Sequence, residues 1–295
     1  MSEVDFAPYV SSGAFRSRSV EEFVGCALDM GLDRIELGSA ARWTPDVLRP
    51  VRDTAKRSIR YLVHNYFPPH ERPFVLNLAA ADPDVLRQSR EHCRTALDLT
   101  SELGAPFYSV HAGFAFAARP EDLGADLTHA PRVPLEEAHR IFVESLRDLC
   151  AYAASRRLLV AIENNVIAPF NLVGGQNRLG LCATADELVR TYKDVGAENL
   201  GFLIDVGHLK VTANALKFDS YAFLESVAPW VVAFHLSDND GLADQNLPFR
   251  DDAWFAPLLA GFPRATMILE AYNLDPPAIR DACATIERAR RRASV

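Results

Sequence analysis

The sequence is poor in cysteine, and its five cysteines lie far apart, at Cys26, Cys93, Cys150, Cys182 and Cys283. None of them forms a Cys-x-x-Cys pair or stands at zinc-finger spacing from a histidine, which argues against a zinc finger. Their odd number and wide scatter are typical of a reduced, intracellular protein. We expect each of them to be a small core residue, because cysteine is often buried.

Long apolar runs and an excess of positive charge are also missing. No apolar stretch approaches the roughly 20 residues that span a bilayer, and the opening segment Met-Ser-Glu-Val-Asp-Phe does not have the pattern of a signal peptide. The 31 basic and 39 acidic residues give a formal charge of −8, which provides no general attraction to a phosphate backbone or an anionic membrane. These absences predict a cytoplasmic protein that binds neither membrane nor nucleic acid.

Short apolar runs alternate with longer segments of helical period along the whole chain. Runs such as Leu-Leu-Val-Ala-Ile and Trp-Val-Val-Ala-Phe are apolar almost throughout, as in parallel strands buried on both faces. The predicted strands are Phe6–Val10, Arg34–Gly38, Ile59–His64, Phe107–His111, Leu158–Glu163, Leu200–Asp205, Val231–His235 and Thr266–Glu270.

The intervening segments have helical patterns. In Pro134–Arg157, apolar residues form one stripe at 3.6-residue spacing, and the leading proline suits a first helical turn. Ser19–Glu22 and Thr184–Glu187 have the capping-box spacing that opens a helix. The stripe in Val85–Leu103 is followed by Gly104, a typical helix stop. Two further helices are predicted at Lys217–Val227 and Pro276–Arg292.

Eight strand–helix units in about 300 residues match the size of a single (β/α)8 barrel. An open doubly wound sheet is the alternative, but it would use fewer strands and would need no eighth unit to close. The chain has no linker and no low-complexity segment, so we predict one domain over residues 1–295. Long connections follow four strands and would gather on the catalytic face of a barrel: Asn65–Pro83, Ala112–Pro134, Asn164–Ala183 and Leu236–Asp252.

Six of the eight predicted strands end in a residue that can bind a metal ion or transfer a proton. A lone histidine or glutamate at a strand end is more often a hydrogen-bonded structural residue. In a closed barrel, however, the strand ends form one ring, so these side chains can converge. The six residues are His64, His111, Glu163, Asp205, His235 and Glu270.

Four of these residues form an oxygen-rich set with one imidazole: Glu163, Asp205, His235 and Glu270. Such a set accepts Mn²⁺, Mg²⁺, Co²⁺ or Zn²⁺. Crowded carboxylates need a cation, because like charges at close range would otherwise force protons onto some of them. His208 stands one turn past strand six, where Gly207 would let the backbone bend. His208 is a candidate substrate donor or further metal ligand.

A polar loop follows strand seven. Because Asn, Asp and Gly favour turns, Asp238 and Asp240 are explained equally well by a solvated turn and by a function. Asp244 is the better functional candidate. Arg250, farther along, is a candidate for binding a phosphate or carboxylate group, with a plain surface charge as the alternative. Phe67-Pro-Pro, Phe114-Ala-Phe116 and Trp254-Phe255 are candidates for the wall of a sugar pocket or for loop anchors.

In combination, Ile-Glu163-Asn, Ile-Asp205-Val-Gly-His208, Phe-His235-Leu-Ser-Asp and Leu-Glu270 resemble the xylose isomerase-like barrel superfamily. That superfamily includes sugar isomerases, ketose 3-epimerases, inositol-catabolism enzymes and endonuclease IV, and the resemblance covers nearly the whole chain. In its epimerase members a Glu, Asp, His, Glu quartet holds one divalent ion. The resemblance therefore implies a metal-dependent isomerase or epimerase of a carbohydrate.

The resemblance also implies roles for individual residues. Glu163 and Glu270 become the acid/base pair, one removing a proton from the carbon next to a carbonyl and the other returning one through an enediolate. His208 would bind a substrate hydroxyl, and Glu36 would contact the far end of the sugar. Several members are dimers or tetramers, so a homo-oligomer is one of the states to expect.

The similarity to endonuclease IV is also close. That family binds three zinc ions with nine ligands. Eight of them have counterparts here: His64, His111, Glu163, Asp205, His208, His235, Asp244 and Glu270. The ninth, a histidine in an Asp-x-His pair, is Asn246, and an amide is a poor zinc ligand beside imidazole.

The asparagine at position 246, in place of the ninth histidine ligand, favours one divalent ion, or two. His64, His111, His208 and Asp244 would then form a second metal site or bind substrate. A phosphodiesterase acting on abasic DNA and a non-catalytic ligand-binding descendant stay open as alternatives.

Overall fold

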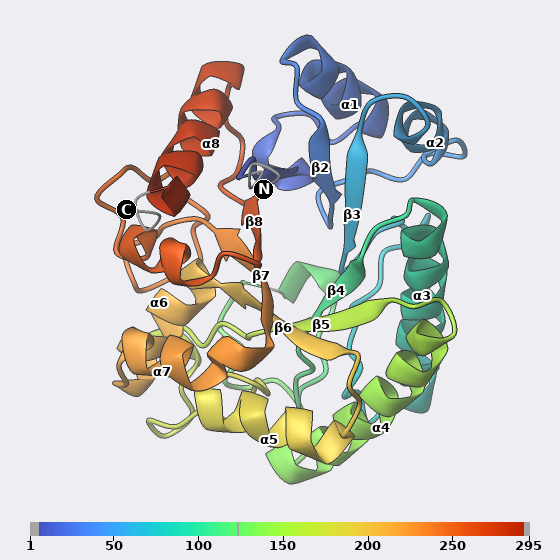
Figure 1. The fold of residues 1–295 in the computed structure, drawn as a ribbon. Coiled ribbons are helices and arrows are strands. Elements are labelled where there is room, and N and C mark those ends of the chain that lie inside the picture. Colours follow the sequence, from blue (N-terminus) through green and yellow to red (C-terminus); the bar gives the residue numbers. More distant parts are fainter. Residues whose placement is uncertain (1–5, 123, 292–295) are drawn as a thin grey trace.

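The computed structural model describes residues 6–122 and 124–291. Eight parallel strands form one closed barrel in sequence order (Figure 1), which confirms the predicted fold. The strands are β1 (Tyr9–Ser11), β2 (Arg34–Leu37), β3 (Arg60–His64), β4 (Phe107–His111), β5 (Leu159–Glu163), β6 (Leu200–Asp205), β7 (Val231–Leu236) and β8 (Thr266–Leu269). Only β1 differs clearly from its predicted range. It begins after Pro8, because proline cannot donate a hydrogen bond to the ladder.

Helices surround the barrel (Figure 1). They are α1 (Val20–Asp29), α2 (Arg49–Ala55), α3 (Pro83–Glu102), α4 (Leu135–Ala154), α5 (Ala185–Val195), α6 (Val206–Leu216), α7 (Ser220–Val227) and α8 (Pro276–Arg291). Short 3-10 helices are η1 (Ser12–Ala14), η2 (Pro120–Asp122), η3 (Pro169–Asn171), η4 (Ala228–Trp230) and η5 (Ala256–Gly261). Between β7 and β8, η5 stands where the other units have an α-helix. None of the helices in the described ranges is long and apolar enough to cross a membrane.

The helix starts agree only in part with the sequence patterns. The capping box at Thr184 and Glu187 is present, and α5 ends at Gly196 with φ 68°. The box predicted at Ser19 is absent, because Ser17 Oγ donates to Glu22 at 2.5 Å and accepts from the Ser19 amide at 3.0 Å. The carboxylate that the box needs is therefore already bound.

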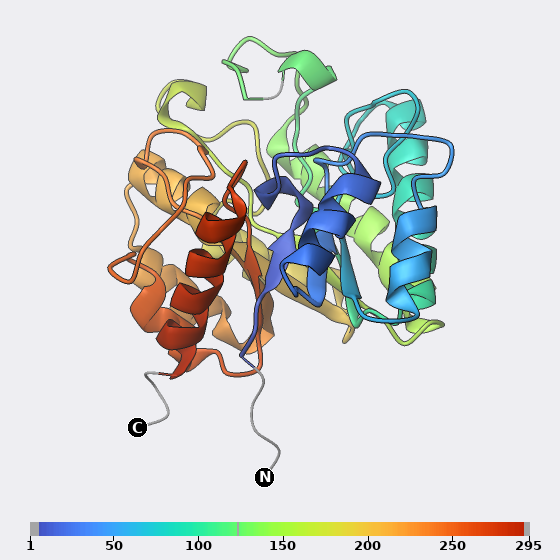
Figure 2. The same cartoon turned by 90° about the horizontal axis from the view of Figure 1, so that it is seen from above.

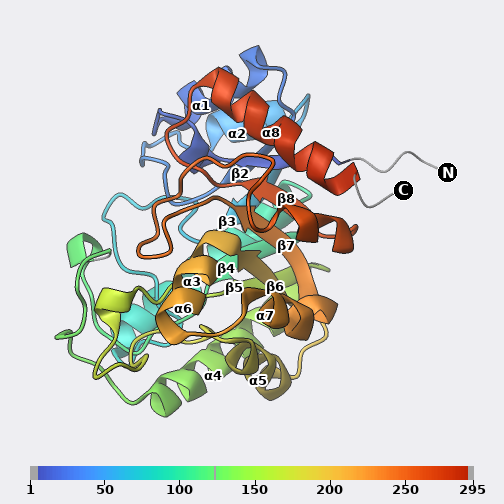
Figure 3. The same ribbon diagram turned by 90° about the vertical axis from the view of Figure 1, so that its left-hand side faces the viewer.

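Two helices, α4 and α6, differ from the sequence predictions. Pro134 is the residue before α4 and not its first residue. The α6 helix was not predicted from sequence at all. It is buried on most of its surface, so its apolar residues show no single stripe. Figure 3 shows α6 and α7 beside each other outside the barrel.

The barrel interior is filled from below by a small apolar cluster, whose buried members are Leu62, Ala105, Phe107, Ala161, Leu203, Ala233 and Ile268. Side chains two residues apart on a strand point to the same face. Glu163, two residues after Ala161, therefore lies on the same inner face and directly above this cluster. The same spacing places Asp205 above Leu203 and His235 above Ala233, so the carboxyl ends of the strands carry the site.

Candidate active site

Four buried side chains meet at the ends of β5 to β8. Within the described residues, Glu163, Asp205, His235 and Glu270 each offer one ligand atom, and these atoms all lie within 4.8 Å of one another. None of the four residues is more than 7% exposed. The register explains the convergence, since Asp205 pairs directly with His235 across β6 and β7. We call these four residues the quartet.

His235 lies at the centre of the quartet. Its Nδ1 is 2.8 Å from Glu270 Oε2, 3.7 Å from Glu163 Oε1 and 3.9 Å from Asp205 Oδ2. The two glutamates come from the outermost of four consecutive strands, so Asp205 and His235 stand between them. This order leaves one carboxylate on each side of the imidazole.

The quartet is held by a layer of supporting hydrogen bonds. His235 Nε2 lies 2.9 and 3.1 Å from the two oxygens of Glu36, so Nδ1 is the nitrogen that faces the quartet. Asp205 Oδ1 accepts from the His208 amide at 2.8 Å, which leaves Oδ2 for the site. Asn164 joins β5 to β6, because its side chain donates to the Asp205 carbonyl and accepts from the Asp205 amide.

Several buried atoms of the quartet lack hydrogen bonds of acceptable geometry within the described part of the chain. They are Glu163 Oε1 and Oε2, Asp205 Oδ2 and His235 Nδ1. Buried polar atoms without partners are costly, and these atoms lie around one point. Three carboxylates and one imidazole suit a divalent ion such as Mn²⁺, Mg²⁺, Co²⁺ or Zn²⁺. The donor set therefore fits the metal ion that the sequence predicts.

The electrostatics of the quartet show the same crowding of acidic groups. Burial raises the pKa of Asp205 to about 8, and Glu270 and Glu163 add to this shift against the opposing effect of His208. Burial also raises the pKa of Glu270. Burial alone would raise the pKa of Glu163 as well, but His111, His235 and His64 together hold it well below its usual range. A cation at this point would balance the carboxylates.

Two further histidines lie on the other side of Glu163. His64 Nε2 and His111 Nε2 are 3.4 and 3.3 Å from Glu163 Oε2, and the three residues form another group that could hold an ion. Burial lowers the pKa of both histidines, which favours the neutral form that can bind a metal ion. Ser109 Oγ lies 3.0 Å from His64 Nδ1 and orients the ring.

His208 and Asp244 form a pair at the edge of the site. His208 Nε2 lies 3.3 Å from Asp244 Oδ2, and His208 Nδ1 lies 2.9 Å from the Asn164 carbonyl. Burial lowers the pKa of His208, but Asp205 and Asp244 raise it well above its usual range. Asn246, at the position of the ninth endonuclease IV ligand, donates to Asp244 Oδ2 at 3.2 Å and so supports this pair.

Two residues that were predicted to contact the substrate, Glu36 and Arg250, do not line the cavity. Glu36 is completely buried and absent from the cavity wall, because it lies one layer below His235 and both its oxygens face that ring. In this position Glu36 can orient the candidate metal ligand His235, but it does not face the cavity in which a sugar would lie. Arg250 is exposed and does not line the cavity. Nothing in this geometry brings it to a substrate above the quartet.

The structure also shows the surroundings of Gly207 and of the two aspartates for which a turn and a function were equally good explanations. Gly207 lies in the first turn of α6, where a Cβ would meet Ser237 Oγ at 2.8 Å, so its role is close packing and not a bend. Asp238 is bound by Lys210 Nζ at 2.6 Å. Asp240 Oδ1 accepts from the Leu242 amide, as in the solvated turn.

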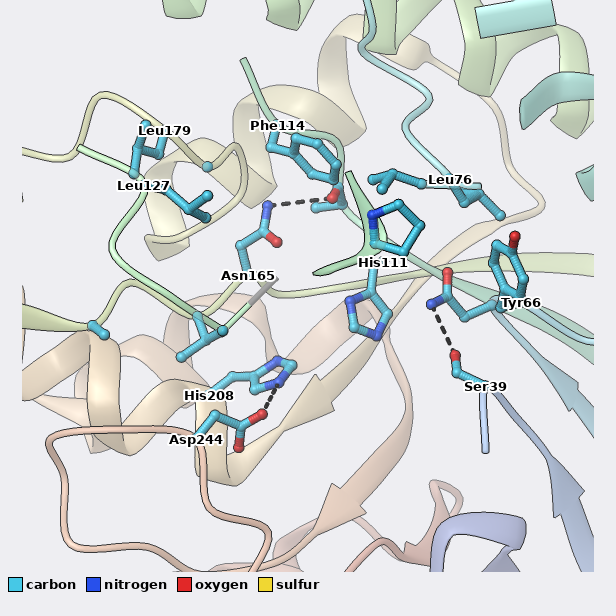
Figure 4. A pocket seen from close by; sticks show the side chains of 18 of the residues that line it. Ser39, Tyr66, Leu76, His111, Phe114, Leu127, Asn165, Leu179, His208 and Asp244 are labelled. Atoms are coloured by element: carbon cyan, nitrogen blue, oxygen red, sulfur yellow. Dashed lines mark hydrogen bonds and ion pairs between the residues drawn. The ribbon is translucent and has the colours of Figure 1, made fainter. Parts of the chain in front are cut away.

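A cavity of about 610 Å³ opens above the quartet. His64, His111, His208, Asp244 and Glu270 line its floor. Figure 4 shows His111, His208 and Asp244 around this space, with Leu76, Phe114, Leu127 and Leu179 beside them.

Some of the predicted wall residues are in place and others are not. Of the predicted aromatic groups, Phe114 and Phe116 line the cavity. Phe67 is a buried core residue, and Trp254 lies elsewhere.

Some contributing residues had not been predicted. Asn164, Asn165 and Tyr272 are the clearest, and Tyr272 OH donates to Glu270 Oε1 at 3.4 Å. The one sequence signal for them is adjacency, since each lies within two residues of a strand-end glutamate.

The model of the family described as xylose isomerase-like TIM barrel matches residues 25–289. The chain belongs to this family. Among solved structures, this xylose isomerase-like barrel is similar to a D-tagatose 3-epimerase-like protein, with 18% identity, a TM-score of 0.72 and coverage of 98% of both chains. It is also similar to 3-keto-D-glucoside 4-epimerase from E. coli, with 15% identity, a TM-score of 0.67 and coverage of 97% of this chain and 100% of the other.

Two further relatives carry different descriptions. A protein from Thermus thermophilus, in a crystal soaked with ZnCl2, is 22% identical with a TM-score of 0.63, covering 96% of this chain and 97% of the other. A probable endonuclease 4 of Thermoplasma acidophilum is 25% identical over 170 residues, which are 56% of this chain and 50% of that protein. The xylose isomerase-like chain thus spans about half the length of this curated relative.

Proposed function

We propose that the chain is a divalent-metal-dependent isomerase or epimerase of a sugar or sugar derivative. The observation that carries this proposal is the buried quartet, with Glu163 and Glu270 on either side of His235. A site that only binds a ligand does not need two such carboxylates. The names of two structural relatives, a D-tagatose 3-epimerase-like protein and a 3-keto-D-glucoside 4-epimerase, support a carbohydrate substrate.

The reaction is a proton transfer next to a carbonyl. One glutamate takes the proton from the carbon, and the pair of electrons of the broken C–H bond moves toward the carbonyl oxygen to give an enediolate. The second glutamate then returns a proton to carbon. The four residues of the quartet would hold a divalent ion, which would supply Lewis-acid stabilisation of the negative charge on the substrate oxygens. His208 binds a substrate hydroxyl, and Glu36 keeps His235 in place from below.

Deuterium exchange tests this proposal. Metal-loaded protein is incubated in deuterated water with a panel of aldoses and ketoses, and carbon-bound deuterium is measured by mass spectrometry and NMR. We expect at least one sugar to take up deuterium next to its carbonyl. Glu163→Gln and Glu270→Gln should each lower the rate by about 10²- to 10⁴-fold.

The exposed Glu136 of α4 provides the control, since it pairs with Arg190 and does not line the cavity. Glu136→Gln should exchange at the unmodified rate. Failure of folded, metal-loaded protein to exchange a proton in any sugar of the panel would count against the proposal.

A second candidate function has its own support. The group of His64, His111 and Glu163 could hold an additional ion, and the curated relative is a probable endonuclease 4. A phosphodiesterase acting on abasic DNA would use two or more ions. Protein loaded with Zn²⁺, Mn²⁺ or Mg²⁺ should then nick a duplex with one abasic site. A duplex left intact with all three metals removes this candidate, and one ion per chain by elemental analysis favours the isomerase.

A further inference from the structure

The cavity above the quartet has a polar floor and an apolar outer wall. The wall comes from the long connections after β3, β4 and β5. In Figure 2 the connections after β4 and β5, in green and yellow-green, extend beyond the barrel on the same side. The apolar residues that they place on the wall include Phe74, Leu76, Phe114, Phe116, Leu127 and Phe170.

The part of the cavity lining that the structure describes offers an anionic substrate no lysine or arginine, and its His208 is already paired with Asp244. The charged groups of the lining include the carboxylates of Asp244 and Glu270. The carboxylate of Glu163 lies just below, next to His208 Nδ1 at 3.2 Å. A phosphate group is usually held by arginine, lysine or a helix N-terminus. A sugar phosphate would bring negative charge to an outer wall whose described residues include neither lysine nor arginine.

Hydrogen bonds within the chain hold the apolar wall together. The Asn165 side-chain amide donates to the carbonyls of Ala112, Gly113 and Leu181 at 3.3, 3.0 and 2.7 Å, which ties the β4 and β5 connections together. The Leu127 amide donates to Asn171 Oδ1 at 2.8 Å and links them again farther out. A wall with its own hydrogen bonds is preorganised for binding, which lowers the entropic cost of ordering it.

The wall carries aromatic side chains whose apolar rings suit contact with a flat group. The rings of Phe114 and Phe116 stack with centroids 4.4 Å apart. Phe170, at the rim, keeps 46% of its surface exposed. The cavity volume of about 610 Å³ falls within the range of about 300–1,000 Å³ that is typical of pockets for drug-sized ligands. A single six-carbon sugar over the quartet would leave this wall uncovered.

We infer that the substrate is a neutral sugar derivative with an apolar, ring-sized substituent, such as an aryl glycoside oxidised to the ketone on its sugar ring. The sugar lies over the quartet, and the substituent packs against Phe116, Phe170 and Leu76. This inference rests on the proposed function, because the quartet is taken as the place of the sugar. It excludes sugar phosphates as the preferred substrates.

Calorimetric titration of the metal-loaded protein with non-reacting sugars tests the inference. The probes are methyl β-D-glucoside, phenyl β-D-glucoside, glucose and glucose 6-phosphate. We expect the phenyl glucoside to bind at least tenfold more tightly than the methyl glucoside, and glucose 6-phosphate to bind no more tightly than glucose. The inference is overturned if glucose 6-phosphate binds tenfold more tightly than glucose. It is also overturned if the phenyl glucoside does not bind, or if its affinity is less than threefold higher than that of the methyl glucoside.

Variants of the wall locate the preference. Phe170→Ala and Phe116→Ala should each lower the ratio of phenyl to methyl affinity by at least threefold. Because Phe170 is exposed at the rim, its truncation should leave the fold intact. Tyr221→Ala on α7 is the matched control, since Tyr221 is 52% exposed and does not line the cavity. An unchanged ratio in both phenylalanine variants would refute the placement of the substituent.

Binding and exchange separate this inference from the proposed function. A phenyl preference together with no deuterium exchange in any sugar would leave the ligand class standing and remove the isomerase. Deuterium exchange that is fastest with sugar phosphates would have the opposite meaning. It would support the proposed isomerase or epimerase and refute a neutral substrate with an apolar substituent.

Discussion

Replacing Glu36 by glutamine tests how far metal binding depends on the support of His235. Glu36 is completely buried, and its two oxygens lie 2.9 and 3.1 Å from His235 Nε2. Glutamine has nearly the same shape, so the packing of the barrel interior should survive. The change removes the negative charge but keeps one oxygen that can accept the imidazole proton.

The size of the effect follows from the hydrogen bond. A hydrogen bond to a charged group contributes about 1.5–3 kcal/mol, against about 1 kcal/mol for a neutral one. Glu36→Gln should therefore weaken the interaction that holds His235 by about 0.5–2 kcal/mol. If this loss appears in metal binding, the dissociation constant rises by about 2- to 30-fold, which overlaps the roughly 10- to 100-fold range of supporting partners at metal sites.

The assay is a competition titration of metal-free protein with Mn²⁺, Co²⁺ and Zn²⁺ against a chelator of known affinity. Urea unfolding of the metal-free protein is measured in parallel and should change less than the metal affinity does. Glu102→Gln is the control, because Glu102 is a half-exposed residue that pairs with Arg52 on the outer helices. A folded Glu36→Gln protein whose metal affinity stays within twofold of the unmodified protein would refute the supporting role.

Three further changes should have measurable results. Burial lowers the pKa of His92 from its usual 6.5 to about 4, so the stability this neutral histidine contributes is present above pH 6.5 and is lost as the pH falls toward 4. The full contribution is about 3 kcal/mol. The urea midpoint of the unmodified protein should therefore fall more steeply between pH 6.5 and 4 than that of His92→Gln. Parallel pH profiles for the two proteins would contradict this prediction. Asn165→Ala removes three hydrogen bonds of the cavity wall. This variant should lower the free energy of unfolding by about 1–3 kcal/mol, which denaturation measures. It should also lower the ratio of phenyl to methyl glucoside affinity, which calorimetry measures. In Gly207→Ala the new Cβ would lie 3.1 Å from Asp205 Oδ1, so the free energy of unfolding should fall by about 1–3 kcal/mol and metal affinity should weaken. Gly25→Ala, where nothing lies within 4 Å, is the matched control and should change neither quantity for the worse.

The sequence by itself determined the barrel and the four proposed ligands. Apolar runs such as Leu159–Glu163 and Val231–Leu236 are strands because both faces of a parallel barrel strand are buried. Polar residues at the ends of such runs have to converge, since a closed barrel brings all its strand ends to one rim. The convergence of the quartet therefore followed from the order of residues along the chain, before any distance was known.

Only the tertiary structure decided what surrounds the quartet. Glu36 lies near the end of its strand like the predicted ligands, but the stagger of the barrel places it one layer lower, against His235 and away from the cavity. Asn165 ties two connections together through carbonyl groups that belong to distant parts of the sequence. Such contacts depend on how loops fold back over the rim, and no local pattern encodes them. The apolar wall, which has neither lysine nor arginine among its described residues, is for that reason a property of the fold, while the acidic quartet beneath it can be read from the sequence.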